Sequence, residues 1–214
     1  IFELIQGEGG FNTAPREFFV ELMKVCKDAG IAVWDDEVQA FGRTTEMFAF
    51  DALNLAEHID LCTVGKMTQV CATLFTKEYN PKPGLLSATF LGSAEAIRVG
   101  GRILDRLSEP GRYGPDGLHA KHYKLFEKHA RALIAKRPDW FPPCEGAADL
   151  VGGAGGMVRL TPFGGKKEPV TKLCRQCFDD GLIVFYCGHG PYHLRMLPPL
   201  GVFKEDQWAT AFAL

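Results

Sequence analysis

An acidic residue at position 36 follows an apolar run and could bind a cationic group. The run Ile31-Ala32-Val33-Trp34 is typical of a buried parallel strand, and the acids Asp35-Asp36-Glu37 come directly after it. In parallel α/β sheets, ligands lie beyond the carboxyl ends of the strands. A buried carboxylate needs a cationic partner, and a protonated pyridine nitrogen would be one such partner. The alternative is that Asp36 caps a loop or forms an ion pair with Arg43.

Lys66 directly follows the next predicted strand, residues 59–64, and its glycine. A lysine that faces an apolar crevice can lose its proton and form a Schiff base. A single lysine is more commonly a surface residue, but two adjacent strand ends would deliver both Asp36 and Lys66 to one crevice. The pair therefore predicts a pyridoxal phosphate site, in which the acid keeps the ring protonated and makes it an electron sink.

Two further groups of residues could bind anions. Arg195 lies in an apolar stretch before Pro198-Pro199, and its guanidinium can bind a carboxylate through two hydrogen bonds. Glu8, in a glycine-rich turn, could neutralise Arg195 when no anionic substrate is present. Ser87 and Thr89 precede a predicted helix, and hydroxyls at a helix N-terminus suit a phosphate. Ordinary N-capping is the simpler explanation for these two hydroxyls.

The elements that would position these residues form a β-α-β unit in the first 36 residues. Residues 1–6 read as a buried strand, and Pro15 suits the first turn of a helix. Gly30 is typical of the position just after a helix. One face of this helix is predicted to point inward, namely Phe19, Leu22, Cys26 and Ala29. The strand at residues 31–34 completes the unit.

Breaks at Glu109-Pro110-Gly111 and Gly114-Pro115 predict a boundary between two domains, residues 1–110 and 111–214. The first domain reads as α/β with a mostly parallel sheet. The second mixes strands and helices without strict alternation and therefore reads as α+β. Its long helix, residues 118–136, is predicted to turn four residues inward, namely Tyr123, Phe126, Ala130 and Leu133.

Composition excludes several classes of function. The 214 residues are 46% hydrophobic with a net charge of −2, so neither a nucleic acid nor an anionic membrane is indicated as a partner. Seven scattered cysteines fit reduced thiols in the cytoplasm better than a disulfide framework. The C-x-x-C pair Cys174 and Cys177 lies in a predicted helix and is interpreted as incidental, and no metal site is predicted.

Three motifs, in the same order, resemble the C-terminal half of the class-III aminotransferases of the ornithine, acetylornithine and 4-aminobutyrate type. Residues 3–10, ELIQGEGG, are similar to E-P-I-Q-G-E-G-G of that family. Residues 36–44, DEVQAFGRT, are similar to D-E-V-Q-T-G-F-G-R-T with one residue fewer, and residues 195–200, RMLPPL, are similar to R-L-L-P-P-L. The resemblance covers nearly the whole chain. It implies part of the large domain of a fold-type-I pyridoxal phosphate transferase, followed by a smaller and incomplete C-terminal domain.

The resemblance also implies roles around the cofactor. Asp36 would hold the pyridine nitrogen, Val38 would pack on one face of the ring, and Gln39 would bind the ring hydroxyl oxygen. Because alternate residues of a strand point to opposite faces, the strand must end or twist at Val38 for all three to reach the ring. Lys66 would form the internal aldimine and move the proton, and Thr89 would reach the phosphate of the neighbouring subunit in a homodimer.

For the substrates, the resemblance implies that Arg195 binds the α-carboxylate and that Glu8 acts as its gate. One site could then accept an amino donor, such as ornithine, acetylornithine, lysine or 4-aminobutyrate, and afterwards 2-oxoglutarate. A decarboxylase, a racemase or an aminomutase on the same scaffold remains an alternative, as does a truncated inactive chain. The Glu8–Arg195 gate favours transamination, because it suits two alternating substrates. His189 and His193 flank Arg195 and are interpreted as structural.

The sequence departs from the family pattern at several positions. Leu4 replaces a proline, Met67-Thr68-Gln69-Val70 replaces a glycine run, and Leu91 and Ser93 replace a glycine and an asparagine. These departures leave the amino donor open. The chain starts in a predicted strand and ends in a helix-like run, so a fragment of a longer protein is expected. Such a fragment would be poorly active alone, because the family's main phosphate cup lies in the N-terminal half.

Overall fold

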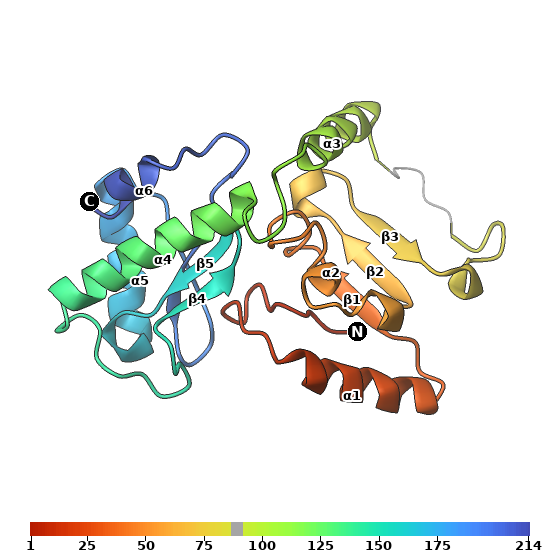
Figure 1. Ribbon diagram of the computed structural model, residues 1–214, viewed down its shortest axis with the longest axis horizontal. Coiled ribbons are helices and arrows are strands. Elements are labelled where there is room, and N and C mark those ends of the chain that lie inside the picture. The colour runs from red at the N-terminus through yellow and green to blue at the C-terminus, as the bar shows by residue number, and fades with distance from the viewer. Residues whose placement is uncertain (87–91) are drawn as a thin grey trace. The chain divides into compact units, whose positions relative to one another are not determined.

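The computed structural model describes residues 1–86 and 92–214, which form two compact units. The first unit comprises Ile1–Ile5 and Thr13–Arg112, and the second comprises Gln6–Asn12 and Tyr113–Leu214. The glycine-rich turn near the N-terminus thus belongs to the second unit, although it interrupts the first in sequence. Figure 1 shows the elements of both units.

The first unit contains a three-stranded sheet in the order β1-β2-β3. β1 (Trp34–Glu37) and β2 (Leu61–Val64) are parallel, and β3 (Ala72–Phe75) is antiparallel to β2. The predicted strand at residues 1–6 is reduced to a single parallel bridge between Phe2 and Asp35. The unit also contains α2 (Ala49–Ala52) and α3 (Ala94–Leu107), and the Ser93 hydroxyl caps α3 by accepting the amide of Ala96 at 3.0 Å.

β1 starts three residues later than predicted, so the acids lie inside the strand. The backbone of Val33 is already bound by the next segment: its carbonyl accepts the amides of Asp60 (3.0 Å) and Leu61 (3.1 Å). Its amide donates to the Asp60 carboxylate at 2.8 Å. The regular ladder with β2 then begins at Trp34. Residues 31–33 of the apolar run therefore lead into the strand, and only Trp34 belongs to it.

Helix α1 (Arg16–Asp28) ends as predicted but buries a different face. Gly30 has φ +68°, and the amides of Gly30 and Ile31 donate to the carbonyls of Lys27 (2.9 Å) and Cys26 (2.8 Å), which closes the helix. The buried residues are Phe19 and Met23, one turn apart, while Leu22 and Ala29 are exposed. The prediction for Leu22 and Ala29 was wrong because Phe19 stacks on Phe2, at 6.1 Å between ring centroids, and this contact sets the inner face.

The second unit is built on a four-stranded antiparallel sheet in the order β4-β5-β7-β6. Its strands are β4 (Val151–Ala154), β5 (Met157–Leu160), β6 (Phe185–Cys187) and β7 (His193–Met196). Its helices are α4 (Leu118–Lys136), α5 (Lys167–Asp179) and α6 (Gln207–Ala211). Phe126 and Ala130 of α4 are fully buried in a cluster with Val158 and Trp208, as predicted for this helix, and Tyr123 and Leu133 pack against the cluster.

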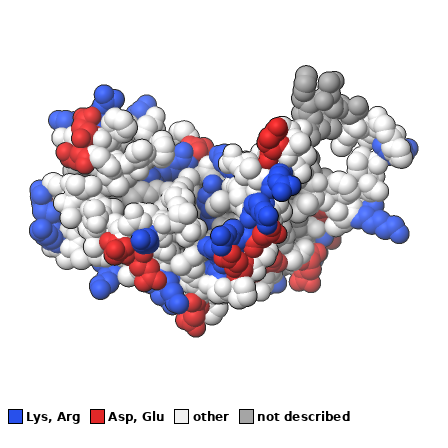
Figure 2. Space-filling model, turned by 90° about the horizontal axis from the view of Figure 1, so that it is seen from above, with Lys and Arg blue, Asp and Glu red and all other residues white. Residues whose placement is uncertain are grey.

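The thiols and the surface charges give no sign of a disulfide framework or of a strongly charged patch on the face drawn in Figure 2. All seven cysteines are free thiols, and burial raises the pKa of Cys174, in the C-x-x-C of α5, to about 11. On the face drawn in Figure 2, basic and acidic side chains are interspersed. Within residues 1–86 and 92–214, no helix has the length and apolar character needed to cross a membrane.

Candidate functional site

Asp36 lies at the edge of the first unit's sheet where the parallel strands β1 and β2 both end. It is half-buried and in register with Thr63. Its Oδ1 accepts the amide of Val38 at 3.0 Å, so Asp36 caps the turn that follows the strand. β1 ends at Glu37 and residues 38–40 form a turn. This early end is the condition under which Asp36, Val38 and Gln39 could all approach one ligand.

Lys66 begins a tight 3-10 turn, Lys66–Thr68, directly beyond β2. Its φ is +43°, a left-handed conformation that costs a residue with a side chain about 1–3 kcal/mol. The Lys66 carbonyl accepts both the amide of Gln69 (3.2 Å) and its side-chain amide (3.1 Å). The Thr68 hydroxyl donates to the Val70 carbonyl at 2.6 Å. The residues that replace the family's glycine run therefore hold the strained lysine, whose side chain is exposed.

The turns after β1 and β2 touch through Val38 and Gly65. A Cβ added to Gly65 would lie 3.6 Å from Cγ1 of Val38 and 3.1 Å from Sγ of Cys71. The side chain of Val38 thus packs on the residue that precedes Lys66. Gln39 is buried, and its carbonyl accepts Nη1 of Arg43 at 2.7 Å. Arg43 therefore helps to fix the turn, and its own pKa is lowered by burial.

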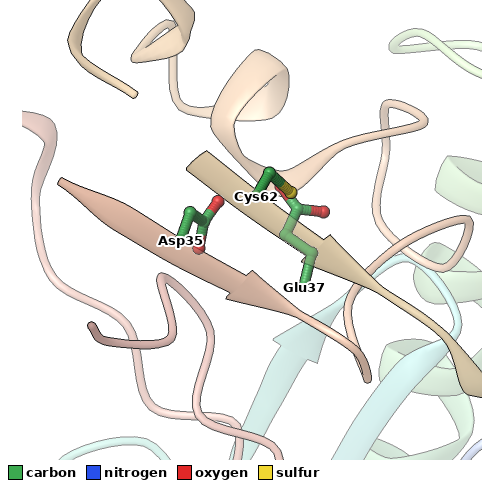
Figure 3. Close-up of side chains that lie close together, drawn as sticks. All are labelled: Asp35, Glu37 and Cys62. Carbon is green, nitrogen blue, oxygen red and sulfur yellow. The ribbon is translucent and has the colours of Figure 1, made fainter. Parts of the chain in front are cut away.

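The opposite face of β1 carries a buried cluster that the sequence analysis missed, formed by Asp35, Glu37 and Cys62 (Figure 3). Glu37 accepts the amides of Ala49 (2.8 Å) and Phe50 (3.0 Å). The Asp35 side chain is fully buried, and its carboxyl group interacts with that of Glu37 and with the backbone of Leu4. Burial, together with the charge of Glu37, raises the pKa of Asp35 to about 9, so Asp35 is protonated at neutral pH.

The same cluster has the dimensions of a cation site. Its carboxylate oxygens and sulfur lie within 4.8 Å of one another, a spacing that a divalent cation could bridge. Burial raises the pKa of Cys62, which keeps the thiol protonated. The sequence could have indicated this cluster, because side chains alternate along a strand. Alternation places Asp35 and Glu37 on one face and Asp36 on the other.

In the second unit, Arg195 of β7 pairs with Glu8 of the glycine-rich turn. Nη1 of Arg195 lies 2.6 Å from Oε1 of Glu8 and donates to the Gly7 carbonyl at 3.3 Å. The Arg195 side chain is 13% exposed, whereas that of Glu8 is 65% exposed. The structure therefore brings together the two residues that the sequence suggested as an internal pair.

The Glu8 turn is anchored to the sheet of the second unit by its backbone and by His193. The Glu8 carbonyl accepts the amide of Gly188 at 2.9 Å. The imidazole of His193 lies against Gly10, where a Cβ would come within 2.8 Å of its Cδ2, and Gly10 has φ +107°. His193 is buried, and its Nδ1 lies 2.7 Å from the Thr161 hydroxyl. Burial, followed by the charge of Arg159, lowers the pKa of His193 to about 4, so it is neutral.

Ser87 and Thr89, the predicted phosphate ligands, lie outside the described residues. The departure at Leu91 lies there too. Arg159 of β5 is a further residue that the sequence analysis did not single out. Alternation along β5 places it on the face opposite Val158 and Leu160, but its neighbours depend on strand pairing.

Comparisons with known proteins give the family. A model of the family "Aminotransferase class-III" matches residues 1–213. The diaminobutyrate–2-oxoglutarate transaminase of Virgibacillus pantothenticus is 30% identical over 211 residues, which are 96% of this chain and 48% of that protein. The acetylornithine aminotransferase of Listeria monocytogenes is 29% identical over 208 residues, 94% of this chain and 49% of that protein. The chain thus spans about half the length of these relatives.

Solved structures agree with the fold expected from sequence. The lysine aminotransferase of M. tuberculosis in its internal aldimine form superposes with a TM-score of 0.81 at 24% identity, over 99% of this chain and 46% of that chain. The ornithine aminotransferase of Toxoplasma gondii superposes with a TM-score of 0.75 at 21% identity, over 99% and 48%. The expected fold class, part of a fold-type-I transferase, is confirmed. The match over residues 1–213 shows that this chain belongs to the class-III aminotransferase family.

Proposed function

We propose that the protein containing this chain is a pyridoxal-phosphate-dependent aminotransferase in which Lys66 holds the cofactor. The observation that carries the proposal is the strained lysine itself. Lys66 has φ +43° directly beyond β2, and the parallel strand β1 ends beside it with Asp36. Backbone strain of this kind persists where the surrounding structure over-determines it, often at active sites.

The residues at these two strand ends fit this cofactor. Oδ1 of Asp36 accepts the amide of Val38 in the turn. The carboxylate of Asp36 would keep the pyridine nitrogen protonated. Val38 packs beside Lys66 and would cover one face of the ring, and Gln39 would bind the ring hydroxyl oxygen. Ser87 and Thr89 would bind the phosphate, with Thr89 reaching the neighbouring subunit of a homodimer. The family resemblance alone supports the proposal for the phosphate and the dimer.

When bound, pyridoxal phosphate would supply a ring that accepts the electron pair left by proton removal. Nζ of Lys66 would take that proton from the substrate carbon and return it. Its exposed side chain leaves the amine free to move, while the 3-10 turn holds its backbone. A lysine whose backbone is held in place while its amine can move is suited to carry a proton between two atoms.

Arg195 would bind the substrate carboxylate, and Glu8 would occupy the guanidinium between substrates. Glu8 is the more exposed partner, so it can move into water while Arg195 stays in place. Such a gate suits an amino donor followed by 2-oxoglutarate. The donor is proposed to be an ω-amino acid such as ornithine, acetylornithine, lysine or 4-aminobutyrate. The names of the relatives support this class and add diaminobutyrate. The seven free thiols support a cytoplasmic location.

The test uses the protein that contains this sequence, reconstituted with pyridoxal phosphate. The wild type should show the visible absorption band of the lysine-bound cofactor and should be trapped by borohydride. Lys66→Ala should lose both, while Lys172→Ala, at an exposed position of α5, should keep both. A band and trapping that survive in Lys66→Ala would refute the proposal. Formation of glutamate from 2-oxoglutarate and an amino donor, rather than carbon dioxide or an inverted amino acid, identifies the reaction as transamination.

A further inference from the structure

The middle of α3 contains two adjacent glycines, Gly100 and Gly101, that lie in different surroundings. Glycine inside a helix is less favourable than alanine, because it loses more backbone freedom on folding. The buried residues of α3 are Gly100 and Leu107, which lie on one face of the helix. Among the described residues of other segments, no atom lies within 4 Å of a Cβ placed on Gly101. Gly100 thus has a packing role that Gly101 lacks.

Gly100 lies directly against the backbone of the turn that contains Lys66. A Cβ on Gly100 would lie 2.7 Å from the carbonyl oxygen of Thr68 and 3.4 Å from Cγ2 of Val70. The first distance is well below van der Waals contact, and the oxygen belongs to the backbone. Helix α3 packs on the 3-10 turn Lys66–Thr68 at this point. The missing side chain at position 100 therefore allows the helix and the turn to approach each other.

Thr68 has little freedom to move away from α3. Its side chain is buried, and its hydroxyl donates to the Val70 carbonyl at 2.6 Å. Gln69 follows with φ +60°, and its amide donates to the Lys66 carbonyl at 3.2 Å. The turn is therefore closed on both sides of Thr68. A displacement of the Thr68 carbonyl would be passed along the turn to Lys66, whose own φ is +43°.

The second buried residue of α3 contacts the loop that follows Asp36 in the chain. A Cβ on Gly42, which has φ +73°, would lie 2.9 Å from Cδ1 of Leu107 and 3.3 Å from Cγ of Met67. The side chains of Leu107 and Met67 thus both lie at this glycine. Through Gly100 and Leu107, one face of α3 contacts the segments beyond both parallel strands.

We propose that Gly100 is a positioning residue for Lys66, because the lack of a side chain here lets α3 fix the turn that carries the lysine. The inference rests on the proposed function, since the position of Nζ matters where it binds the cofactor and moves a proton. Residues 67–70, directly after Lys66, contain no glycine. The space that a glycine provides lies instead on the facing helix. Gly100 touches neither cofactor nor substrate and acts through the backbone of Thr68.

The test is a steady-state comparison of Gly100→Ala with Gly101→Ala in the protein that contains this sequence, loaded with pyridoxal phosphate. Both variants add one methyl group to α3, but only Gly100→Ala meets the turn. Gly100→Ala should lower kcat by about 10- to 100-fold and change KM for the amino donor by less than about threefold, because a misplacement of about 1 Å can cost about 100-fold in rate. Gly101→Ala should keep kcat and KM and should unfold at a higher urea concentration. Equal kcat values in the two variants would overturn the inference.

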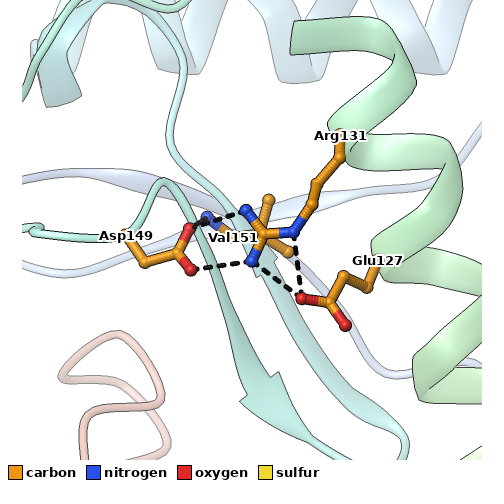
Figure 4. A network of polar contacts seen from close by, with 4 residues as sticks. All are labelled: Glu127, Arg131, Asp149 and Val151. Atoms are coloured by element: carbon orange, nitrogen blue, oxygen red, sulfur yellow. Dashed lines mark hydrogen bonds and ion pairs between the residues drawn. The ribbon is translucent and has the colours of Figure 1, made fainter.

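A variant in the second unit controls for a general loss of stability. Figure 4 shows Asp149 bound to Arg131 of α4, with Nη2 of Arg131 2.8 Å from Oδ2 of Asp149. Oδ1 of Asp149 also accepts the amide of Val151 at 2.9 Å. Asp149→Ala removes both contacts, so it should lower the urea midpoint and leave kcat within about threefold of the wild type. If Asp149→Ala lowers kcat as much as Gly100→Ala does, the loss reflects stability alone and Gly100 is not a positioning residue.

Urea unfolding of the cofactor-free protein tests the contact without any reaction. A double-mutant cycle combines Gly100→Ala with Lys66→Gly, because a glycine at position 66 lets the turn adopt another conformation. The factor by which Gly100→Ala lowers the folding equilibrium constant should be about fivefold smaller in Lys66→Gly than in the wild type. Additive effects would refute the contact, whichever group Lys66 holds. A visible band that survives in Lys66→Ala would instead refute the proposed function.

Thr68→Val loosens the same turn without adding bulk to α3. Valine has nearly the shape of threonine but lacks the hydroxyl that donates to the Val70 carbonyl. This variant should lower kcat by about 3- to 10-fold with KM unchanged, because the Thr68 carbonyl is then held by α3 alone. An unchanged kcat in Thr68→Val would show that the turn does not fix Lys66, which would also contradict a positioning role for Gly100.

Discussion

The buried acid Asp35 provides a test of the electrostatics beside the proposed cofactor site. It is fully buried beside the carboxyl group of Glu37, and its ordinary pKa of 3.8 is raised to about 9 by burial and by Glu37. Folding therefore binds a proton to Asp35 across this range of pH. Its contribution to stability is fully present below the ordinary pKa and is lost as the pH rises toward 9.

The size of the effect follows from the pKa difference. One unit corresponds to about 1.4 kcal/mol, so the unfolding free energy should fall by up to ~4 kcal/mol between pH 5 and pH 8. Because the Asp35 proton is shared electrostatically with Glu37, we expect a drop of roughly 2–4 kcal/mol. Asn has nearly the shape of a protonated Asp and cannot ionise. The unfolding free energy of Asp35→Asn should therefore change little with pH, and its advantage over the wild type should grow by roughly that amount between pH 5 and pH 8.

The measurement is urea unfolding at several pH values between 5 and 8, followed by fluorescence. Asp105→Asn, at an exposed position of α3, is the matched control and should keep the slope of the wild type. The reasoning fails if Asp35→Asn shows the same pH slope as the wild type. It also fails if Asp35→Asn is the less stable protein at pH 8. In the same assay, stabilisation of the wild type by a divalent cation that is lost in Asp35→Asn would identify Asp35 as a cation ligand.

Two other variants test the strained lysine and the gate. Lys66→Gly should raise the unfolding free energy by about 1 kcal/mol, because glycine adopts φ +43° without steric penalty, and a destabilised variant in urea unfolding would contradict the assigned strain. Glu8→Gln should tighten binding of 2-oxoglutarate by roughly tenfold, because the carboxylate that competes for Arg195 is gone. Calorimetry measures this change, and equal or weaker binding would argue against a gate.

Local patterns in the sequence determined much of the fold. The glycine after α1, the inward face of α4 and the α/β character of the first unit follow from residue spacing and backbone preference, which act over a few residues. The three family motifs identified the family in advance. Alternation along β1 also separates Asp36 from Asp35 and Glu37, because it requires only the period of a strand.

Contacts between distant segments were decided only by the tertiary structure. The burial of Met23 rather than Leu22 depends on where Phe2 stacks on α1. Glu8 meets Arg195 across 187 positions because its turn is bound to the sheet of the second unit. Arg159 lies opposite Arg195 because β5 and β7 pair in that register. Sequence periodicity predicts which face of a strand a side chain occupies, whereas strand register and packing determine which residue lies opposite it.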